Sequence, residues 1–233
     1  MKIYAIIQAR MNSTRFPGKV LYSVHKKPML SYMLERVNRC QELKGVIVAT
    51  SVEKTDEPIV QYCIENNVPY FRGPLNNVAE RFKEIIEYKG LECFIRLSGD
   101  SPLMDPEIIS KGILHFNNYG HDFVTNIMPR TYPKGQSVEI VRSEVFLSAY
   151  PNMKEKDDFE HVTPIFYRNP SLYNIYNFEN EGGCLADINL SVDTAEDMER
   201  FKLLVSRMKK SHLNYGLNDI MKIYHLVSHK LDI

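Results

Sequence analysis

Short apolar runs alternate with segments of helical periodicity, and this alternation predicts an α/β fold with a Rossmann-like, doubly wound, mostly parallel sheet. The apolar runs have the length of buried strands. Each intervening segment carries one apolar stripe of the kind that covers a sheet. The chain has 233 residues, 44% of them hydrophobic, which is enough to bury a sizeable core. We therefore expect one domain over residues 1–233.

The first half of the chain carries the regular βα rhythm. Helix starts are marked by Asn77, which has Glu80 three residues later, and by the run Asp105-Pro106-Glu107. Residue Thr194 marks a later helix start in the same way. The expected strands cover residues 3–8, 46–50, 68–71, 93–97 and 188–193, and the expected helices cover 28–40, 57–66, 77–88, 195–209 and a final segment from 217.

The region from about 122 to 187 breaks this rhythm. It is richer in Tyr, Asn and Pro, with strand-like runs at 123–128 and 137–141 and a short helix at 143–149. We interpret it as a smaller inserted region that serves dimerisation or binds a second substrate, the acceptor.

Composition excludes several classes of protein. Lys plus Arg and Asp plus Glu both number 29, so no overall basic field is present to hold a nucleic acid or an anionic membrane. No apolar run approaches ~18 residues, so we expect no membrane span and no signal peptide. The four cysteines are far apart without a CxxC pair, which favours buried, reduced thiols and a cytoplasmic protein. These are Cys40, Cys63, Cys93 and Cys184.

A loop rich in cations follows the first strand. Residues 10–19 contain Arg10, Arg15 and Lys19 together with small polar residues, a Pro and a Gly. In a doubly wound sheet this loop lies at the carboxyl edge, where ligands bind, and its cations suit the phosphates of a triphosphate. It is neither a Walker loop nor a GxGxxG loop. The alternative is a solvated loop whose cations only maintain solubility.

Two aspartates follow two expected strands. Asp100 comes after the strand at 93–97, and Asp193 ends the strand at 188–193. If the strands are parallel, both carboxylates emerge at the edge that holds the cationic loop, where they form a candidate Mg2+ clamp. The alternative is that each aspartate only caps the helix that follows it.

Three segments resemble one known family. The run IIQARMNSTRFPGKVL resembles the ARxxSxRxPxK signature of the CMP-sugar synthetases, including the 3-deoxy-manno-octulosonate cytidylyltransferases, and is more similar to the SpsF-type spore coat polysaccharide biosynthesis proteins. The run RLSGDSPLMDPEII resembles QGDEPLI, and LSVDTAEDMERF resembles VDTPEDLE. The resemblance extends in the same order from residue 1 to about 208, and it implies a fold of the nucleotide-diphospho-sugar transferase type.

The resemblance also implies an activity. It predicts a Mg2+-dependent transfer of CMP from CTP to a sugar or sugar-like acceptor, with release of pyrophosphate, in surface polysaccharide synthesis. It further implies a homodimer formed through the middle region, where the Tyr-rich run 167–178 suits an interface. Two alternatives remain open: the same fold with another NTP or with a phosphorylated or amino-acid-like acceptor, and a nucleotide-binding module without chemistry.

Roles for individual residues follow from the resemblance. Ser98 and Ser101 stand where the octulosonate and sialate enzymes have Gln and an acid, so the choice of base is less firmly implied. The implied catalytic residues are Arg10, Lys19, Asp100 and Asp193, of which the two aspartates hold the metal. The implied nucleotide-binding residues are Gln8, Ala9, Arg10, Ser13, Arg15, Lys19, Arg72, Asn77, Arg81, Ser98, Gly99 and Asp100. The implied acceptor-binding residues are Lys134, Gln136, Glu139, Glu160 and His161, with His161 an alternative general base.

Overall fold

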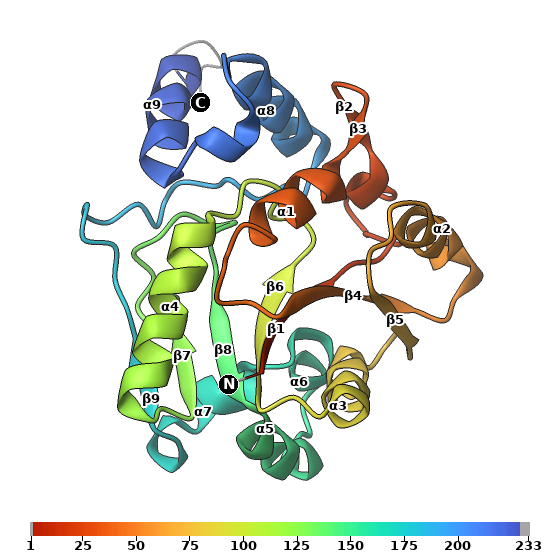
Figure 1. The fold of residues 1–233 in the computed structure, drawn as a ribbon, viewed down its shortest axis with the longest axis vertical. Coiled ribbons are helices and arrows are strands. Elements are labelled where there is room, and N and C mark those ends of the chain that lie inside the picture. Colours follow the sequence, from red (N-terminus) through yellow and green to blue (C-terminus); the bar gives the residue numbers. More distant parts are fainter. Residues whose placement is uncertain (1, 229–233) are drawn as a thin grey trace.

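The central feature of the computed structural model, which describes residues 2–228, is a seven-stranded sheet in the spatial order β5-β4-β1-β6-β8-β7-β9 (Figure 1). Strands β5, β4, β1 and β6 are parallel neighbours. Strand β8 is antiparallel to both β6 and β7, and β9 is parallel to β7. The strands are β1 (Ile3–Gln8), β4 (Gly45–Ser51), β5 (Tyr70–Gly73), β6 (Cys93–Ser98), β7 (Phe123–Thr125), β8 (Glu139–Arg142) and β9 (Ile175–Asn177).

Helices cover both faces of this sheet. One face packs against α1, α2 and α4, with α8 and α9 beyond them, and the other packs against α3, α5 and α7. Figure 1 shows α3 and α5 on the opposite side of the sheet from α1. The helices are α1 (Met29–Val37), α2 (Glu57–Glu65), α3 (Val78–Lys89), α4 (Pro106–Tyr119), α5 (Ser143–Ala149), α6 (Lys156–His161), α7 (Pro164–Arg168), α8 (Ala195–Ser206) and α9 (Leu217–Ser228).

The core lies on both sides of β1, as expected for a strand buried on two faces. Side chains alternate along the strand, so that Ile7 packs with the α1 and α4 side while Ile6 packs with Phe82 of α3. Burial of one such isoleucine stabilises the fold by about 1.5–3 kcal/mol. The prediction of a doubly wound, mostly parallel sheet is therefore confirmed.

The helix-start signals act as expected. The Asn77 side chain accepts the Glu80 N–H at 2.9 Å, and Asp105 accepts the Glu107 N–H at 3.0 Å. Thr194 forms a capping box with Asp197 at the start of α8. Each contact satisfies an amide that the helix itself leaves without a partner. The expected elements of the first half lie within two or three residues of the observed ones.

The middle region differs from its prediction. Strands β7, β8 and β9 are part of the central sheet, so residues 122–187 extend the sheet rather than lying outside it, and their role in dimerisation or acceptor binding stays a prediction. The short runs in this region are strands because Phe123, Ile140 and Val141 are fully buried between helices. The region completes the sheet and then supplies α5, α6 and α7 on one face.

The strand expected at 188–193 is absent from the described sheet. The segment makes only an isolated parallel bridge between Lys134 and Asn189, yet the Val192 N–H donates to the Asp100 carbonyl at 2.8 Å. At the crossing, Gly135 has φ +89°, and a Cβ there would stand 2.6 Å from the Ser191 nitrogen. Glycine is required because no other residue fits this approach. The bridge to Lys134 and the hydrogen bond to Asp100 thus hold Asp193 at the carboxyl edge of the sheet, although this segment is not a strand.

Two smaller elements lie between β1 and α1. A 3-10 turn, η1 (Lys19–Leu21), begins after Gly18, whose φ of +75° lets the chain reverse. A two-stranded ribbon of β2 (Ser23–Val24) and β3 (Lys27–Pro28) follows. Because of this reversal, Lys19 turns back toward the sheet. Across the described residues, no helix combines the length and the apolar character needed to cross a membrane.

Candidate functional site

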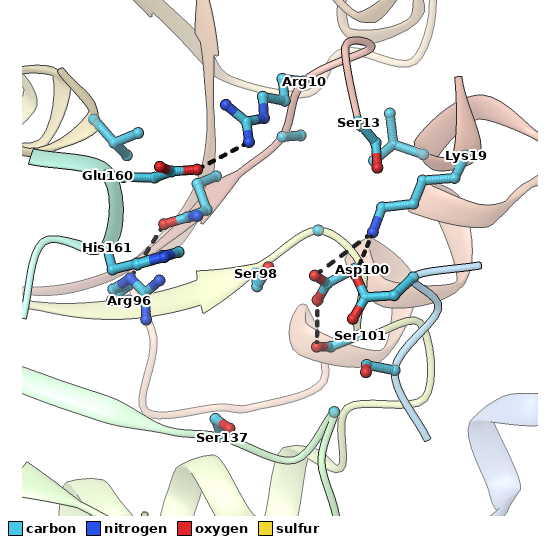
Figure 2. Close-up of a pocket in the computed structure, with 18 of the residues that line it drawn as sticks. Arg10, Ser13, Lys19, Arg96, Ser98, Asp100, Ser101, Ser137, Glu160 and His161 are labelled. Atoms are coloured by element: carbon cyan, nitrogen blue, oxygen red, sulfur yellow. Dashed lines mark hydrogen bonds and ion pairs between the residues drawn. The ribbon is translucent and has the colours of Figure 1, made fainter. Parts of the chain in front are cut away.

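A cavity of about 550 Å³ opens at the carboxyl ends of β1 and β6 (Figure 2). It lies where ligands bind in open α/β sheets. The loop after β1, the turn after β6 and the segment that ends at Asp193 meet there, as the sequence predicted. The predicted site residues that line the cavity are Gln8, Ala9, Arg10, Ser13, Arg15, Lys19, Arg81, Ser98, Gly99, Asp100, Lys134, Glu139, Glu160, His161 and Asp193.

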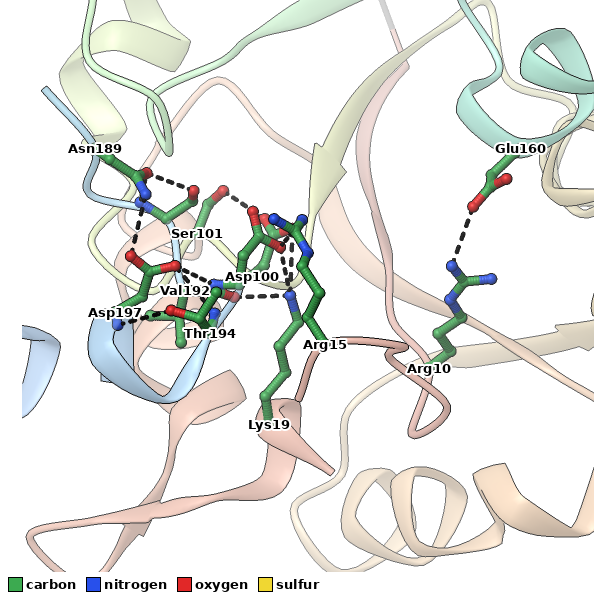
Figure 3. Close-up of polar contacts among 12 residues, drawn as sticks. Arg10, Arg15, Lys19, Asp100, Ser101, Glu160, Asn189, Val192, Thr194 and Asp197 are labelled. Atoms are coloured by element: carbon green, nitrogen blue, oxygen red, sulfur yellow. Dashed lines mark hydrogen bonds and ion pairs between the residues drawn. The ribbon is translucent and has the colours of Figure 1, made fainter. Parts of the chain in front are cut away.

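One end of the cavity holds a compact group of charges, which we name the Lys19 cluster: Arg15, Lys19, Asp100 and Asp193 (Figure 3). The Lys19 side chain is only 8% exposed. Its Nζ donates to Asp193 Oδ1 at 2.8 Å and to the Val192 carbonyl at 2.7 Å, and lies 3.8 Å from Asp100 Oδ2. The expectation that the two aspartates share one sheet edge with the cationic loop is met.

The turn after β6 fixes one carboxylate of this cluster. Gly99 donates its N–H to the Gln8 carbonyl at 2.9 Å, and a Cβ on Gly99 would meet that oxygen at 3.0 Å. The close approach holds the ends of β1 and β6 together. The Ser101 hydroxyl then donates to Asp100 Oδ1 at 3.0 Å, which leaves Oδ2 directed toward Lys19. Ser101 therefore orients the carboxylate.

Arg10 lies apart from the other two cations of its loop. Its guanidinium pairs with Glu160 Oε1 at 3.1 Å, on the far side of the cavity from Lys19 (Figures 2 and 3). Both side chains are more than a third exposed, and a pair of this kind is worth at most about 1 kcal/mol. Arg10 thus does not converge with Arg15 and Lys19 as expected. Glu160 competes for it.

A buried hydrogen-bonded group forms the floor of the cavity beside Arg10. Arg96 on β6 donates through Nε to Gln8 Oε1 at 3.1 Å and pairs with Glu139 on β8. The other Glu139 oxygen accepts the hydroxyls of Thr163 at 2.7 Å and Tyr167 at 2.6 Å. Burial and the Glu139 carboxylate raise the pKa of Tyr167, so it remains a donor. Both Glu139 oxygens are engaged, and its main task is to hold Arg96.

Three predicted residues lie away from the cavity. Arg72 instead joins β5 to the preceding loop by donating to the Ser51 carbonyl and pairing with Glu57. Asn77 is used as the α3 cap described above. Gln136 is fully buried, where its amide bridges the Asp105 N–H and the Leu103 carbonyl. The hydrogen bonds of these three side chains stabilise local structure, so the predicted roles in nucleotide or acceptor binding are corrected.

Arg81 is placed differently again. It lines the cavity but is 1% exposed and donates to the Ala49 carbonyl at 3.2 Å. Burial lowers the pKa of Arg81 to about 10, so the group is still charged at neutral pH. Its guanidinium donates to backbone carbonyls and therefore supports the cavity wall from behind.

Sequence reasoning missed several wall residues. Arg96 is the most important of them, and Ser137 and Ser191 also line the cavity. A signal for Arg96 was available: a cation inside the otherwise apolar strand run CFIRL. Buried charges in strands need a paired carboxylate, which Glu139 provides from the neighbouring strand.

A doubly wound sheet with cations and carboxylates gathered at its carboxyl edge defines a protein of the nucleotide-binding class. The cytidylyltransferase family model matches residues 4–223, and the chain belongs to that family. The chain is 33% identical to the spore coat polysaccharide biosynthesis protein SpsF of Bacillus subtilis over 88% of this chain and 87% of that protein.

Two further similarities support the family assignment. The chain is 33% identical to the 3-deoxy-manno-octulosonate cytidylyltransferase of Geobacter sulfurreducens, over 48% of this chain and 44% of that protein. A solved cytidylyltransferase structure from Leptospira borgpetersenii superposes with a TM-score of 0.90 at 26% identity, covering all of this chain and 96% of the other. The resemblance inferred from the three sequence motifs is thereby confirmed.

Proposed function

We propose that the chain is a Mg2+-dependent nucleotidyltransferase that moves the CMP group of CTP to a sugar or sugar-like acceptor and releases pyrophosphate. Membership of the cytidylyltransferase family supports CMP as the transferred group. The name of the SpsF relative supports an acceptor that is used in polysaccharide synthesis. The observation that carries the proposal is the Lys19 cluster. It brings a buried ammonium and two carboxylates, 93 positions apart in sequence, to one end of a cavity of nucleotide size.

The chain's own residues would act mainly by positioning and by neutralising charge. Arg15 and Lys19 would donate to the oxygens of a bound triphosphate. Gly99 has no side chain, so the backbone there could approach the phosphates closely. An acceptor hydroxyl lying in the half of the cavity near His161 would attack the α-phosphorus in line, and pyrophosphate would leave toward Arg15. Fixed donors around the phosphate stabilise the charge that develops there, so no covalent protein intermediate is required.

The donor set of the Lys19 cluster fits Mg2+. Magnesium prefers one or two carboxylates combined with substrate phosphates and water, and Asp100 and Asp193 both face the same ammonium. Among residues 2–228, no group of three or more His, Cys, Asp and Glu side chains gathers into a metal cage, so the substrate would complete the coordination. When bound, the ion would neutralise phosphate charge and polarise the phosphoryl group.

The cellular setting is part of the proposal. We place the protein in the cytoplasm as a homodimer formed through the run 167–178, in a pathway for surface polysaccharide such as the spore coat. Buried thiols at Cys40 and Cys63 support a reducing compartment, whereas Cys184 is exposed, contrary to expectation.

Pyrophosphate release tests the activity. The protein is incubated with CTP, Mg2+ and a panel of keto-acid and neutral sugars, alongside Asp100→Asn and the control Asp219→Asn, whose half-exposed side chain lies outside the cavity. We expect turnover for the wild type and the control, and at least a hundredfold loss for Asp100→Asn. Full activity of Asp100→Asn would contradict the assigned role of the carboxylate. Absence of turnover with every acceptor would favour the alternative of a nucleotide-binding module.

Nucleotide choice needs a separate measurement. With Mg2+ present, CTP should raise the melting temperature more than UTP, GTP or ATP at the same concentration, because the stabilisation by a ligand increases with the logarithm of its affinity for the native state. Equal shifts for all four would contradict a preference for CTP. A larger shift from a single other NTP would name that donor.

A further inference from the structure

Val162 has a backbone conformation that a β-branched residue rarely adopts. Its φ is +71° and its ψ is −46°, and the Thr163 N–H donates to the His161 carbonyl at 2.8 Å. A hydrogen bond between residues two apart around such a centre defines the strained form of the γ-turn. Steric contact of Cβ with the backbone makes positive φ especially costly for valine.

The other described non-glycine residues with positive φ have ordinary settings. His25 and Lys26 form the two-residue turn of the β2–β3 ribbon, and Asn67 follows the end of α2. Turns of this kind and helix ends commonly accept such backbone angles. Val162 differs because it joins α6 to α7 and is fully buried, packed in the hydrophobic cluster that contains Ile165 and Phe166. Strain is retained there because packing fixes it.

The turn connects three side chains with the cavity. On its N-terminal side, Glu160 pairs with Arg10, and His161 is part of the cavity wall. On its C-terminal side, the Thr163 hydroxyl donates to Glu139, which holds Arg96. Val162 itself is outside the wall. A change of its backbone angles would therefore move the neighbours on both sides, although Val162 does not line the cavity.

We propose that Val162 is a positioning residue: its buried side chain holds a strained γ-turn that sets Glu160 and His161 at the cavity and Thr163 on Glu139. This inference rests on the proposed nucleotidyl transfer and adds a residue to it. Errors of about 1 Å in the placement of reacting groups can lower rates by about a hundredfold. The Lys19 cluster draws on other segments, so the nucleotide phosphates should still bind when the turn is loosened.

Three variants test the proposal: Val162→Gly, Val162→Ala and the control Ile165→Ala. Ile165 lies in the same buried cluster but on α7, so its truncation removes packing without touching the turn. We expect both Val162 variants to lose at least tenfold in kcat, with the KM for CTP changed less than fivefold, the most that release of Arg10 from Glu160 could contribute. Ile165→Ala should lower the melting temperature similarly and keep kcat within twofold.

Melting temperatures measured without substrate test the strain itself. Because glycine accepts positive φ and alanine does not, Val162→Gly should melt at or above Val162→Ala. A Gly variant that melts several degrees below the Ala variant would overturn the strained turn. A loss of kcat no greater than that of Ile165→Ala would overturn the positioning role. A wild-type protein without turnover would overturn the proposed function and, with it, this inference.

Discussion

Replacement of Lys19 by methionine is the most direct perturbation of the site. Methionine keeps an unbranched side chain of similar length but removes the ammonium that joins Asp193, Asp100 and the Val192 carbonyl. Hydrogen bonds to charged groups contribute about 1.5–3 kcal/mol. We expect the free energy of unfolding to fall by about 2–3 kcal/mol and the melting temperature by about 4–12 °C.

A metal titration gives this variant a distinctive signature. In Lys19→Met, the two carboxylates lack their shared counter-charge and attract a divalent cation more strongly than in the wild type. Mg2+ should therefore raise the melting temperature of the variant more than that of the wild type. Turnover should nevertheless fall by about 10²–10³, the usual effect of losing one donor that stabilises transition-state charge.

A surface lysine provides the control for Lys19→Met. Lys27 pairs with Glu35 at 2.8 Å, but both side chains are more than a third exposed, so Lys27→Met should change stability by less than about 1 kcal/mol. Differential scanning fluorimetry with and without Mg2+ and a pyrophosphate assay complete the set. An equal Mg2+ shift in the wild type and Lys19→Met, or turnover within threefold, would refute the reasoning.

Three further outcomes follow from the structure. Glu160→Gln should tighten CTP binding up to about fivefold by calorimetry, because it removes the anion that competes for Arg10; weaker binding would contradict that competition. Glu139→Ala should lower the free energy of unfolding by about 3–5 kcal/mol in urea titrations, because Arg96 loses its buried counter-charge; a cost below about 1 kcal/mol would show that the pair is dispensable. Burial lowers the pKa of His212 to about 4. As the pH falls, the unfolded chain therefore takes up a proton on His212 before the folded chain does. Neutral His212 thus contributes up to about 3 kcal/mol to the free energy of unfolding above pH 6.5, and this contribution is lost as the pH falls from 6.5 to 4. The urea midpoint of His212→Asn should fall less steeply between pH 6.5 and 4 than that of the wild type. Parallel pH profiles for the two proteins would show that His212 does not cause the acid dependence.

The parallel half of the fold could be predicted because local signals and tertiary packing agree there. Apolar runs such as 3–8 are buried on both faces, and the cap at Asn77 marks a real helix start. The segment 188–193 misled the prediction because Leu190 and Val192 are buried like strand residues. Its backbone, however, bonds to a loop and a turn, and hydrophobic alternation carries no information about the backbone partner.

The site was predictable where chemistry is concentrated in a short motif. Lys19, Asp100 and Asp193 meet because all three follow chain segments that end at one sheet edge. Gln136 was misassigned because the sequence pattern of a polar loop residue is the same whether its side chain faces a ligand or forms hydrogen bonds with buried backbone groups. Only the folded structure separates these two uses.

The attachment of Asp193 has a consequence for how this chain can vary in length. The Leu190 N–H donates to the Lys134 carbonyl and the Val192 N–H to the Asp100 carbonyl, so the last few residues alone set the position of the carboxylate. The stretch 181–184 before them is exposed. Insertions or deletions there would cost little in loop closure and leave the anchors in place. A peptide tag inserted at 181–184 should therefore leave Asp193 in its place at the cavity.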